Sequence, residues 1–463
     1  MTFSPFTLHI PRRRLFLSTR LLAALTASLA LVTHASADWT TPSSYSSPGQ
    51  TVRIGDPGYE VDLTDDFDDD TDAFQDAIDY VSNHGGGHVN VPQGTYRFLE
   101  VQLKSDVHLI FQNGCTLYPY TANRDPNDQT NVIMLHLGKL EAIENVSVRS
   151  VGPTRTKFML EGYFNLLQAI SCADVRNFEI RRFDFVDTKT AKASVGLTWR
   201  QSTANGSSLN PNRIPIDGSF RWLKNTDAHF GFGTIQANAG DNIHFQGIES
   251  VGGVALRLET DWKAMTLADY NDSDPDLDLG LSNIYANNIT SRDGQSAIKL
   301  APHALDNGSV TINGVYSYNS LYAIEIMEGS LHKFTEYSYM QPGTFSSITI
   351  NNVTAEYTAG PVVVAWHNLL HYHEDLHHLV YDNGGPDLSY RGPMNVPIEL
   401  KQWRGPSIAP ILNERHPDPA VVINESSILK IGYPSFINKV WTPTDFFTGT
   451  PQQVLADDTP PDP

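Results

Sequence analysis

The sequence predicts an all-β chain in which short strands repeat as the layers of a solenoid. Glycine and proline are frequent, with 33 and 28 residues among 463, and amphipathic patterns of period 3.6 are scarce. Short strands bounded by turn residues recur at irregular intervals of roughly twenty residues or more, which is typical of a solenoid with variable loops. The clearest are Asn145–Val148, Val175–Ile180, Asn242–Phe245, Ser282–Tyr285, Ser309–Val315 and Ser346–Val353. A β-sandwich is the alternative architecture.

A short helix is expected before the first of these layers. Thr71 can cap it, and its apolar residues fall on one stripe: Phe74, Ile78 and Val81. We interpret the acidic run 65–72 as capping and solvation, because acids suit the first turn of a helix, rather than as a metal site. The arrangement resembles the N-terminal cap of the right-handed parallel β-helices of pectate lyases and polygalacturonases. That resemblance implies the same fold here, with a short N-terminal capping helix.

The first 37 residues are expected to be an export signal. They carry four arginines and no acid, then an apolar run and a small-residue cleavage site at Ala35–Ala37. A Sec signal and a twin-arginine signal both agree with this pattern. After it we expect an N-terminal extension (38–60), the parallel β-helix (61–440) and a C-terminal tail (441–463). The mature chain is therefore expected to be secreted.

Charge and cysteine content limit the partners of the chain. The formal charge is −20, and removal of the signal leaves 28 basic and 52 acidic residues, a net charge of −24. Such acidity argues against general affinity for nucleic acid, so a polyanionic ligand requires locally clustered cations. No later apolar run approaches the roughly 20 residues of a membrane span, and we expect a monomer away from the membrane. Cys115 and Cys172 permit one disulfide at most, and two buried thiols agree equally well.

The segment Gly252–Asp261 carries the clearest chemical signal. As a strand it alternates apolar residues with Arg257, Glu259 and Asp261, because strand side chains alternate with period two. Residues two apart on a strand are about 6.5 to 7 Å apart. That separation suits two carboxyl groups with a sugar oxygen and a water between them, and so favours a glycoside hydrolase.

Stacking the expected layers extends this outward face. Ile235 lies about one coil before Leu258, which places Gln236 beside Glu259. Aligning 255–261 with 297–303 places Lys299 beside Arg257 and His303 beside Asp261. The layer 323–327 adds Glu325 to the row of Arg257 and Lys299. The predicted face therefore collects Gln236, Arg257, Glu259, Asp261, Lys299, His303 and Glu325.

These residue types suit acid and base catalysis. Neighbouring carboxylates raise the pKa of one partner, while a cation such as Arg257 can hold the other ionised. Gln236 suits a role in holding the attacking water or a sugar hydroxyl, and His303 a role in orienting Asp261 or binding substrate. The alternative is an exposed ion-pair ladder of little energetic value. An isolated strand favours that alternative, whereas the stacked layers favour the enzyme.

The strand Leu256–Asp261, with Gly233–Gln236 one coil earlier and Ala297–His303 one coil later, resembles the iota-carrageenases of glycoside hydrolase family 82. The capping region 65–96 is similar too. The resemblance implies an endo-acting, inverting hydrolase of the β-1,4 linkages of iota-carrageenan, a sulfated galactan. It also implies that Glu259 is the general acid and Asp261 the general base.

A sulfated substrate requires cations within this acidic chain, because arginine and lysine make charge-assisted bonds to such anions. The expected substrate-binding residues are Arg257, Lys263, Arg292, Lys299 and Glu325. For Lys263 and Arg292 a solvated loop charge is an equal alternative. No cofactor is expected to be required, and the histidines of 367–378 lack metal-ligand spacing. A structural calcium or another ion is left open by the acidic loop Asp269–Asp278, which lacks the EF-hand pattern.

The chain departs from the family in one respect. Some relatives close the cleft with an inserted domain, whereas the segment Glu328–Phe345 is too short for one. A tunnel and processive action are therefore not expected. The segment 368–413 is the candidate loop or small subdomain over the groove.

Other functions of proteins with the same fold can be distinguished by the residues that each requires. A polygalacturonase would need its own catalytic clusters of aspartates on the strands and a Gly-His-Gly step, and we find neither in this sequence. A polysaccharide lyase could use Lys299 as base beside calcium, but would leave Glu259 and Asp261 without a purpose. A non-catalytic polysaccharide-binding solenoid would bind its ligand without releasing reducing ends.

Overall fold

The computed structural model describes residues 50–59, 68–121, 132–160, 166–187, 190–200, 213–260, 262–271, 279–331, 334–382, 389–391, 397–399 and 403–455. The chain divides into two compact units, 1–39 and 40–463, and all described residues belong to the second. The predicted export signal and Asp261 both lie outside the described residues.

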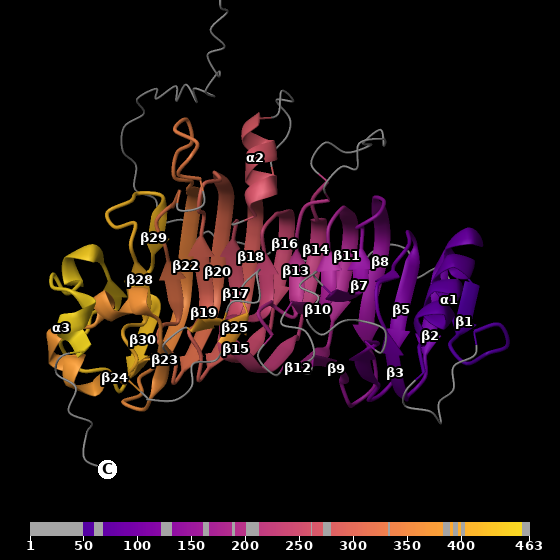
Figure 1. Ribbon diagram of the computed structural model, residues 1–463, viewed down its shortest axis with the longest axis horizontal. Helices are drawn as coiled ribbons and strands as arrows, with labels where there is room; N and C mark the ends of the chain where they lie inside the picture. The colour runs from indigo at the N-terminus through magenta and orange to yellow at the C-terminus, as the bar shows by residue number, and fades with distance from the viewer. Residues whose placement is uncertain are drawn as a thin grey trace, which may run out of the picture. The chain divides into compact units, whose positions relative to one another are not determined.

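Parallel strands follow one another layer upon layer from β1 at one end to β28, β29 and β30 at the other (Figure 1). They form three faces. The first face contains β1 (Gln50–Arg53), β2 (Gly87–Val91), β5 (Val107–Phe111), β8 (Ile143–Ser150), β11 (Val175–Arg181), β14 (Ile216–Arg221), β16 (Gly240–Gln246), β18 (Leu281–Arg292), β20 (Asn307–Tyr318), β22 (Phe345–Glu356) and β29 (Val421–Ile423).

The second face begins with β3 (Thr95–Phe98), β6 (Thr116–Pro119), β9 (Thr156–Leu160) and β12 (Phe183–Asp187). It continues through the first halves of β15 (Lys224–Ala237) and β17 (Glu249–Glu259), the second halves of β18, β20 and β22, and β30 (Ile428–Ile431). The third face contains β4 (Val101–Gln102), β7 (Val132–Leu137), β10 (Leu167–Cys172), β13 (Val195–Leu197), the second halves of β15 and β17, β19 (Ser296–Ala301), β21 (Ile324–Ile326), β28 (Ile411–Asn413) and β31 (Val440–Trp441).

Every pairing along these faces is parallel, and connections between parallel strands are right-handed in nearly all proteins. The chain is thus the right-handed parallel β-helix that the sequence predicted. The six strands expected from turn spacing lie in β8, β11, β16, β18, β20 and β22, all on the first face. The sandwich alternative is wrong.

Asparagines near the start of first-face strands explain why the strands of that face could be predicted from the sequence. Asn145, Asn177 and Asn242 have φ values of 59°, 48° and 53°, the left-handed conformation that short amide side chains tolerate. The Nδ2 atom of Asn177 donates to Oδ1 of Asn145 in the layer before it, at 2.6 Å. The same turn therefore recurs layer after layer.

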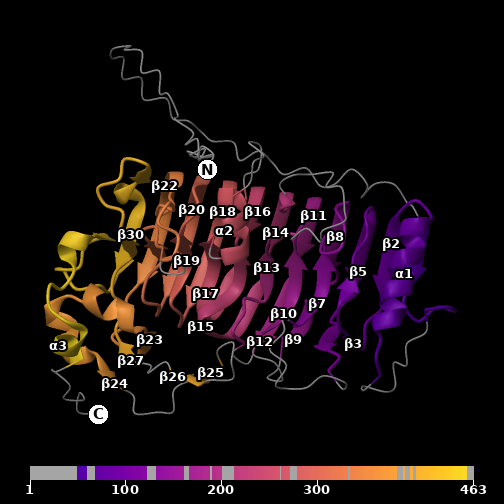
Figure 2. The same cartoon turned by 45° about the horizontal axis from the view of Figure 1, so that its top comes forward.

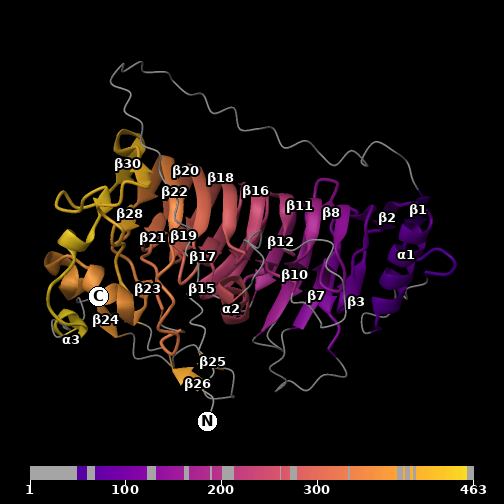
Figure 3. The ribbon, with the colours of Figure 1, turned by 90° about the horizontal axis from the view of Figure 1, so that it is seen from above.

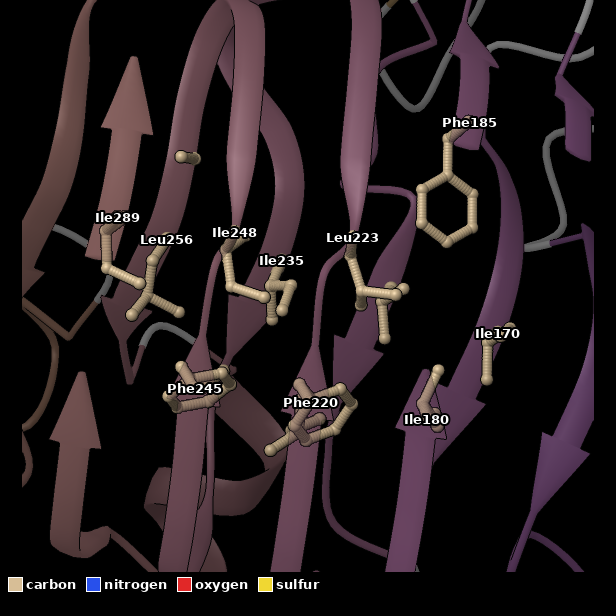
Figure 4. Packing of buried hydrophobic residues seen from close by; sticks show 14 of the residues in the cluster. Ile170, Ile180, Phe185, Phe220, Leu223, Ile235, Phe245, Ile248, Leu256 and Ile289 are labelled. Atoms are coloured by element: carbon tan, nitrogen blue, oxygen red, sulfur yellow. The ribbon is translucent and has the colours of Figure 1, made fainter. Parts of the chain in front are cut away.

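Inward side chains of successive layers stack into one core. Leu256 pairs with Ile235 on one side and Ile298 on the other, and all three are fully buried. The rings of Phe220 and Phe245 stack with centroids 5.3 Å apart, and Figure 4 shows such side chains pointing between the faces. Because each apolar side chain is covered by the next layer, the residues between them are forced outward.

The predicted helix is α1 (Thr71–Asn83), which buries Phe74, Ala77, Ile78 and Val81. Its N-cap is Asp70 rather than Thr71. Both side chains instead accept hydrogen bonds from the backbone at the end of β3. Asp70 Oδ2 accepts the N–H of Arg97 at 2.8 Å, and Thr71 Oγ1 accepts the N–H of Leu99 at 3.1 Å. The cap prediction was wrong by one residue because these tertiary contacts use the two side chains.

The remaining elements leave the stack. α2 (Lys263–Asn271) projects from it after β17 (Figures 1 and 3). The others are β23 (Val362–Val364), η2 (Trp366–His371), η3 (Glu374–Leu379), β24 (Tyr381–Asp382), β25 (Ser389–Arg391), β26 (Pro397–Glu399), β27 (Trp403–Gly405), η4 (Glu425–Ser427), η5 (Pro443–Asp445) and α3 (Pro451–Leu455). Among the described residues, no helix combines the length and apolar character needed to cross a bilayer. Cys115 and Cys172 are buried free thiols, so they form no disulfide.

Candidate functional site

Outward-facing side chains of the third face form a polar row across many layers. The strand register places these residues in line, with Gly196 as the one position without a side chain: Gln102, His136, Ser171, Gly196, Gln236, Arg257, Lys299 and Glu325. Neighbours in the row are about 4.8 Å apart, the spacing between paired strands. Figure 2 shows the order of the strands that carry it, from β10 to β19. The alignment of Arg257, Lys299 and Glu325 is as the sequence predicted.

Glu259 lies at the end of β17, next to this row, and is 5% exposed. Its Oε2 atom forms an ion pair with Nη2 of Arg257. Its Oε1 atom is 3.0 Å from Nε2 of His303. The carboxylate is therefore enclosed between a guanidinium and an imidazole.

These contacts decide the charge of Glu259. Burial alone would raise the pKa of Glu259, but Arg257, the hydrogen bond from His303 and the charge of Lys299 outweigh it. Together they hold that pKa well below its ordinary value. Glu259 is thus ionised at neutral pH in the ligand-free protein. The sequence left open which carboxylate of the pair Arg257 holds ionised, and the described residues show Arg257 on Glu259.

The position of Arg257 depends on a detour of the preceding coil. Between Ala228 and Gly233 the register of β15 shifts, and the ring of Phe232 from this detour lies 5.0 Å from the guanidinium carbon of Arg257. Gly253, at φ 57°, makes room for the detour, because a Cβ there would lie 1.7 Å from the Phe232 carbonyl oxygen. The glycine pair that opens the motif in the sequence thus has a steric reason.

The sequence predicted that Gln236 lies beside Glu259, and this prediction was wrong. Ile235 pairs with Leu256, so Gln236 pairs with Arg257. The prediction assumed a coil of average length, but coil length depends on the loops at the corners, which strand periodicity does not reveal. Gln236 is therefore a neighbour of the guanidinium.

Asn238 was missed by sequence reasoning. It follows Ala237, which pairs with Leu258, so Asn238 occupies the layer position next to Glu259. Its side chain is partly exposed, and Nδ2 reaches the Leu197 carbonyl oxygen at 3.5 Å. With the correct register the sequence would have indicated this amide.

His303 takes its place from the loop after β19. Its backbone is left-handed, with φ 47°, and its carbonyl oxygen accepts the N–H groups of Ser330 and Gly343 at 2.8 and 2.7 Å. The predicted pairing of His303 with Asp261 stays a prediction, because Asp261 lies outside the described residues. The described contact of its Nε2 is with Glu259.

Glu325 keeps the predicted register with Lys299 but is fully buried. Its Oε2 accepts a hydrogen bond from Nε2 of Gln295, at 3.0 Å. A direct substrate contact, as predicted for Glu325, does not agree with this burial. The side chain supports the layer beneath Lys299 instead.

Arg292 lies away from the row, whereas Lys263 follows Glu259 closely along the chain. Lys263 begins α2, and its Nζ forms an ion pair with Glu336. Arg292 ends β18 on the second face, where its Nε donates to Oε1 of Glu249 at 3.1 Å. The structure therefore does not bring Arg292 together with Arg257 and Lys299. Arg292 lies in the second half of β18, which belongs to the second face. The alternation of side chains along a strand does not show where a long strand passes from one face to the next.

A second titratable cluster adjoins Lys299, and sequence reasoning missed it. The Tyr322 hydroxyl and Nδ1 of His371 are 2.9 Å apart, and Nε2 of His371 is 3.6 Å from Oε1 of Glu414. His371 is buried, and this burial, then the charges of His367 and Lys299, lowers the pKa of His371 to about 3. Part of the segment expected to cover the groove therefore lies within electrostatic reach of Lys299.

Within the described ranges, no group of three or more His, Cys, Asp or Glu side chains is arranged to hold a metal ion. Most of the acidic loop Asp269–Asp278 lies outside those ranges. The ion left open for that loop stays untested.

Solved structures first define the fold class. The chain is similar to an iota-carrageenase complexed to iota-carrageenan fragments, with a TM-score of 0.71 and 22% identity over 88% of this chain and 93% of that one. It is equally similar to the family GH82 iota-carrageenase of A. fortis, solved in the absence of chloride ions. The TM-score is 0.71, with 22% identity over 86% of this chain and 90% of that one. At such identities the likeness establishes the β-helix fold.

Sequence relatives add the family. An iota-carrageenase of Zobellia galactanivorans is 31% identical over 296 residues, which span 63% of this chain and 56% of the relative. One of Alteromonas macleodii is 30% identical over 331 residues, which span 70% and 63%. The match thus covers less than two thirds of either relative, and no protein-family model matches the sequence. The predicted resemblance to the iota-carrageenases of glycoside hydrolase family 82 is confirmed.

Proposed function

We propose that this chain is a secreted, endo-acting glycoside hydrolase that cleaves the β-1,4 linkages of iota-carrageenan with inversion. The observation that carries the proposal is the enclosed carboxylate of Glu259 beside Arg257 and Lys299, in a chain 30–31% identical to iota-carrageenases. A similar protein was solved with iota-carrageenan fragments. The working form is a monomer that requires no cofactor.

In this proposal Glu259 is the general acid and Asp261 the general base. On an extended backbone, side chains two residues apart emerge on the same face about 6.5 to 7 Å apart, within the range of roughly 6.5 to 9.5 Å for inverting enzymes. Glu259 protonates the leaving glycosidic oxygen as Asp261 takes a proton from water. The water oxygen bonds to the anomeric carbon while the glycosidic bond breaks.

The acid role requires a proton on Glu259, which Arg257, Lys299 and His303 oppose in the ligand-free protein. A substrate sulfate competes with Glu259 for the guanidinium of Arg257, because both anions accept charge-assisted bonds from it. Once Arg257 binds the sulfate, its lowering effect on the pKa of Glu259 weakens, and burial is opposed only by His303 and Lys299. Substrate binding thereby promotes protonation of the acid. Gln236 contacts the sugar beside this sulfate, and His303 positions the carboxyl group.

The test is the variant Glu259→Gln, which keeps shape and removes the transferable proton. We expect hydrolysis of iota-carrageenan to fall at least about 10²- to 10⁴-fold, with binding of the polymer retained. Reducing ends are measured with kappa-, iota- and lambda-carrageenan, agarose and polygalacturonate, and NMR of the first product anomer tests inversion.

The matched control is Glu144→Gln, which alters an exposed glutamate of β8. It should leave activity unchanged. Full activity of Glu259→Gln would remove the acid assignment. Binding without any reducing ends from the parent protein would favour the non-catalytic solenoid, and cleavage of polygalacturonate alone would favour another class of β-helix enzyme.

A further inference from the structure

Three arginines lie on consecutive layers of the first face. Arg149 of β8 pairs in register with Arg181 of β11, which pairs with Arg221 of β14. These strands are neighbours in Figure 1, and the spacing between paired strands is about 4.8 Å. We call Arg149, Arg181 and Arg221 the arginine ladder. It concentrates positive charge in a chain whose net charge is −20.

The ladder is held in place by its surroundings. The guanidinium carbon of Arg181 lies 4.6 Å from the ring centroid of Trp222. The Nε of Arg221 donates to Oγ of Ser219 at 3.0 Å and lies 4.0 Å from Oε1 of Glu179. Glu179, the acidic neighbour of Arg221, is 1% exposed. A preorganised cluster of guanidinium groups is what an anion requires of its binding site.

The same row continues beyond the ladder as amides. Register extends it from Arg221 through Gln246, Asn287, Asn313 and Asn351, all partly or fully exposed. In the adjacent row the rings of His244 and Tyr285 stack with centroids 4.6 Å apart. Guanidinium groups bind sulfate groups, and amides exchange hydrogen bonds with sugar hydroxyls. The combined row suits an extended, hydroxylated polyanion.

We propose that the arginine ladder and the amides that continue it form a second, non-catalytic binding surface for a sulfated polysaccharide. The inference rests on the proposed function, because the ligand belongs to the same class as the proposed substrate. The surface is distinct from the candidate site, since β8, β11 and β14 belong to the first face and Glu259 to the third.

A polymer bound at this surface remains tethered to the enzyme between cleavage events. Tethering raises the effective concentration of its linkages near Glu259. Long polymers gain from this effect, whereas an oligosaccharide too short to reach both surfaces does not. Duplex DNA offers a comparable density of anions but lacks the hydroxyls that the amides would bind.

The experiment combines Arg181→Ala with Arg221→Ala in the Glu259→Gln background and measures binding of polymeric iota-carrageenan by calorimetry. We expect binding about tenfold weaker, with a smaller dependence on salt, because two cation–anion contacts are lost. The matched control is Arg176→Ala, an exposed arginine of β11 outside the ladder, which should bind as the parent does. In the active background, the double variant should need more polymer for half-maximal rate but cleave a short sulfated oligosaccharide normally.

Unchanged polymer binding by the double variant would overturn the inference. Equal loss of activity on short and long substrates would do the same, because it would mean that the ladder supports the fold. Ladder-dependent binding of a DNA duplex as tight as that of carrageenan would assign the surface to another ligand. Binding does not depend on hydrolysis, so ladder-dependent binding by a protein that cleaves nothing would reject the proposed function and keep this inference.

Discussion

The carboxylate of Glu259 is subject to two opposing influences. Burial favours its neutral form, while Arg257, His303 and Lys299 favour the ionised form and prevail in the ligand-free protein. A catalytic acid needs the neutral form at the moment of bond cleavage. The balance between burial and Arg257 therefore decides at which pH the residue acts.

Replacing Arg257 by methionine should shift the pH profile. Arg257 lowers the pKa of Glu259, so its removal lets burial raise that pKa. An acid works while protonated, and its activity is lost as pH rises through its pKa. The alkaline limb of kcat/KM should therefore move to higher pH in Arg257→Met, while weaker sulfate binding raises KM. Initial rates between pH 4 and 10 on iota-carrageenan provide the measurement.

A shift of the acidic limb instead would make Glu259 the base. Arg292→Met serves as the control, because Arg292 binds Glu249 on the second face. Its pH profile should match that of the parent protein. Thermal unfolding of both variants would show whether the change lies in the site alone.

Within the elements, Gly253 connects the fold to the site. It allows the Phe232 detour of β15 to pass against β17 just before the strand reaches Arg257. Sequence alternation correctly predicted which residues of β17 point outward. It did not reveal the detour, because a bulge is a contact between two strands and not a property of either one.

Gly253→Ala should damage both stability and activity. The new Cβ would lie 1.7 Å from the Phe232 carbonyl oxygen at a φ of 57°, so the detour or β17 must move. We expect unfolding free energy to fall by more than about 3 kcal/mol, with a lower kcat. Gly85→Ala separates the two causes, since Gly85 has φ 91° and nothing within 4 Å of its Cβ position.

The control variant should lose about 1 kcal/mol and keep its activity. Urea unfolding and reducing-end rates measure both quantities. Equal losses in the two variants would mean that backbone strain alone matters. Steric contact with the detour would then play no part.

Across the whole β-helix, stability comes from stacked layers and not from covalent links. Cys115 and Cys172 are buried and unpaired, and Cys172 stacks in register with Leu137 and Leu197 of the adjacent layers. Burial raises the pKa of the Cys115 thiol to about 11 and raises that of Cys172 as well. Neither thiol is therefore reactive in the folded protein.

The protein should be insensitive to reductant. Dithiothreitol should leave Tm unchanged, and a thiol reagent should label neither cysteine rapidly until denaturant unfolds the chain. Labelling followed by mass spectrometry measures this directly. A drop in Tm on reduction, or rapid labelling of the native protein, would contradict the buried free thiols.

The sequence by itself determined the solenoid, its capping helix, and the outward side chains Arg257, Glu259 and Lys299. It could do so because alternation and turn residues act over a few neighbouring positions. The tertiary structure alone decided that Gln236 faces Arg257, that His303 binds Glu259, that Glu325 is buried and that Arg292 lies on another face. Those outcomes depend on coil length and on contacts between residues 20 to 45 positions apart, which no local pattern specifies.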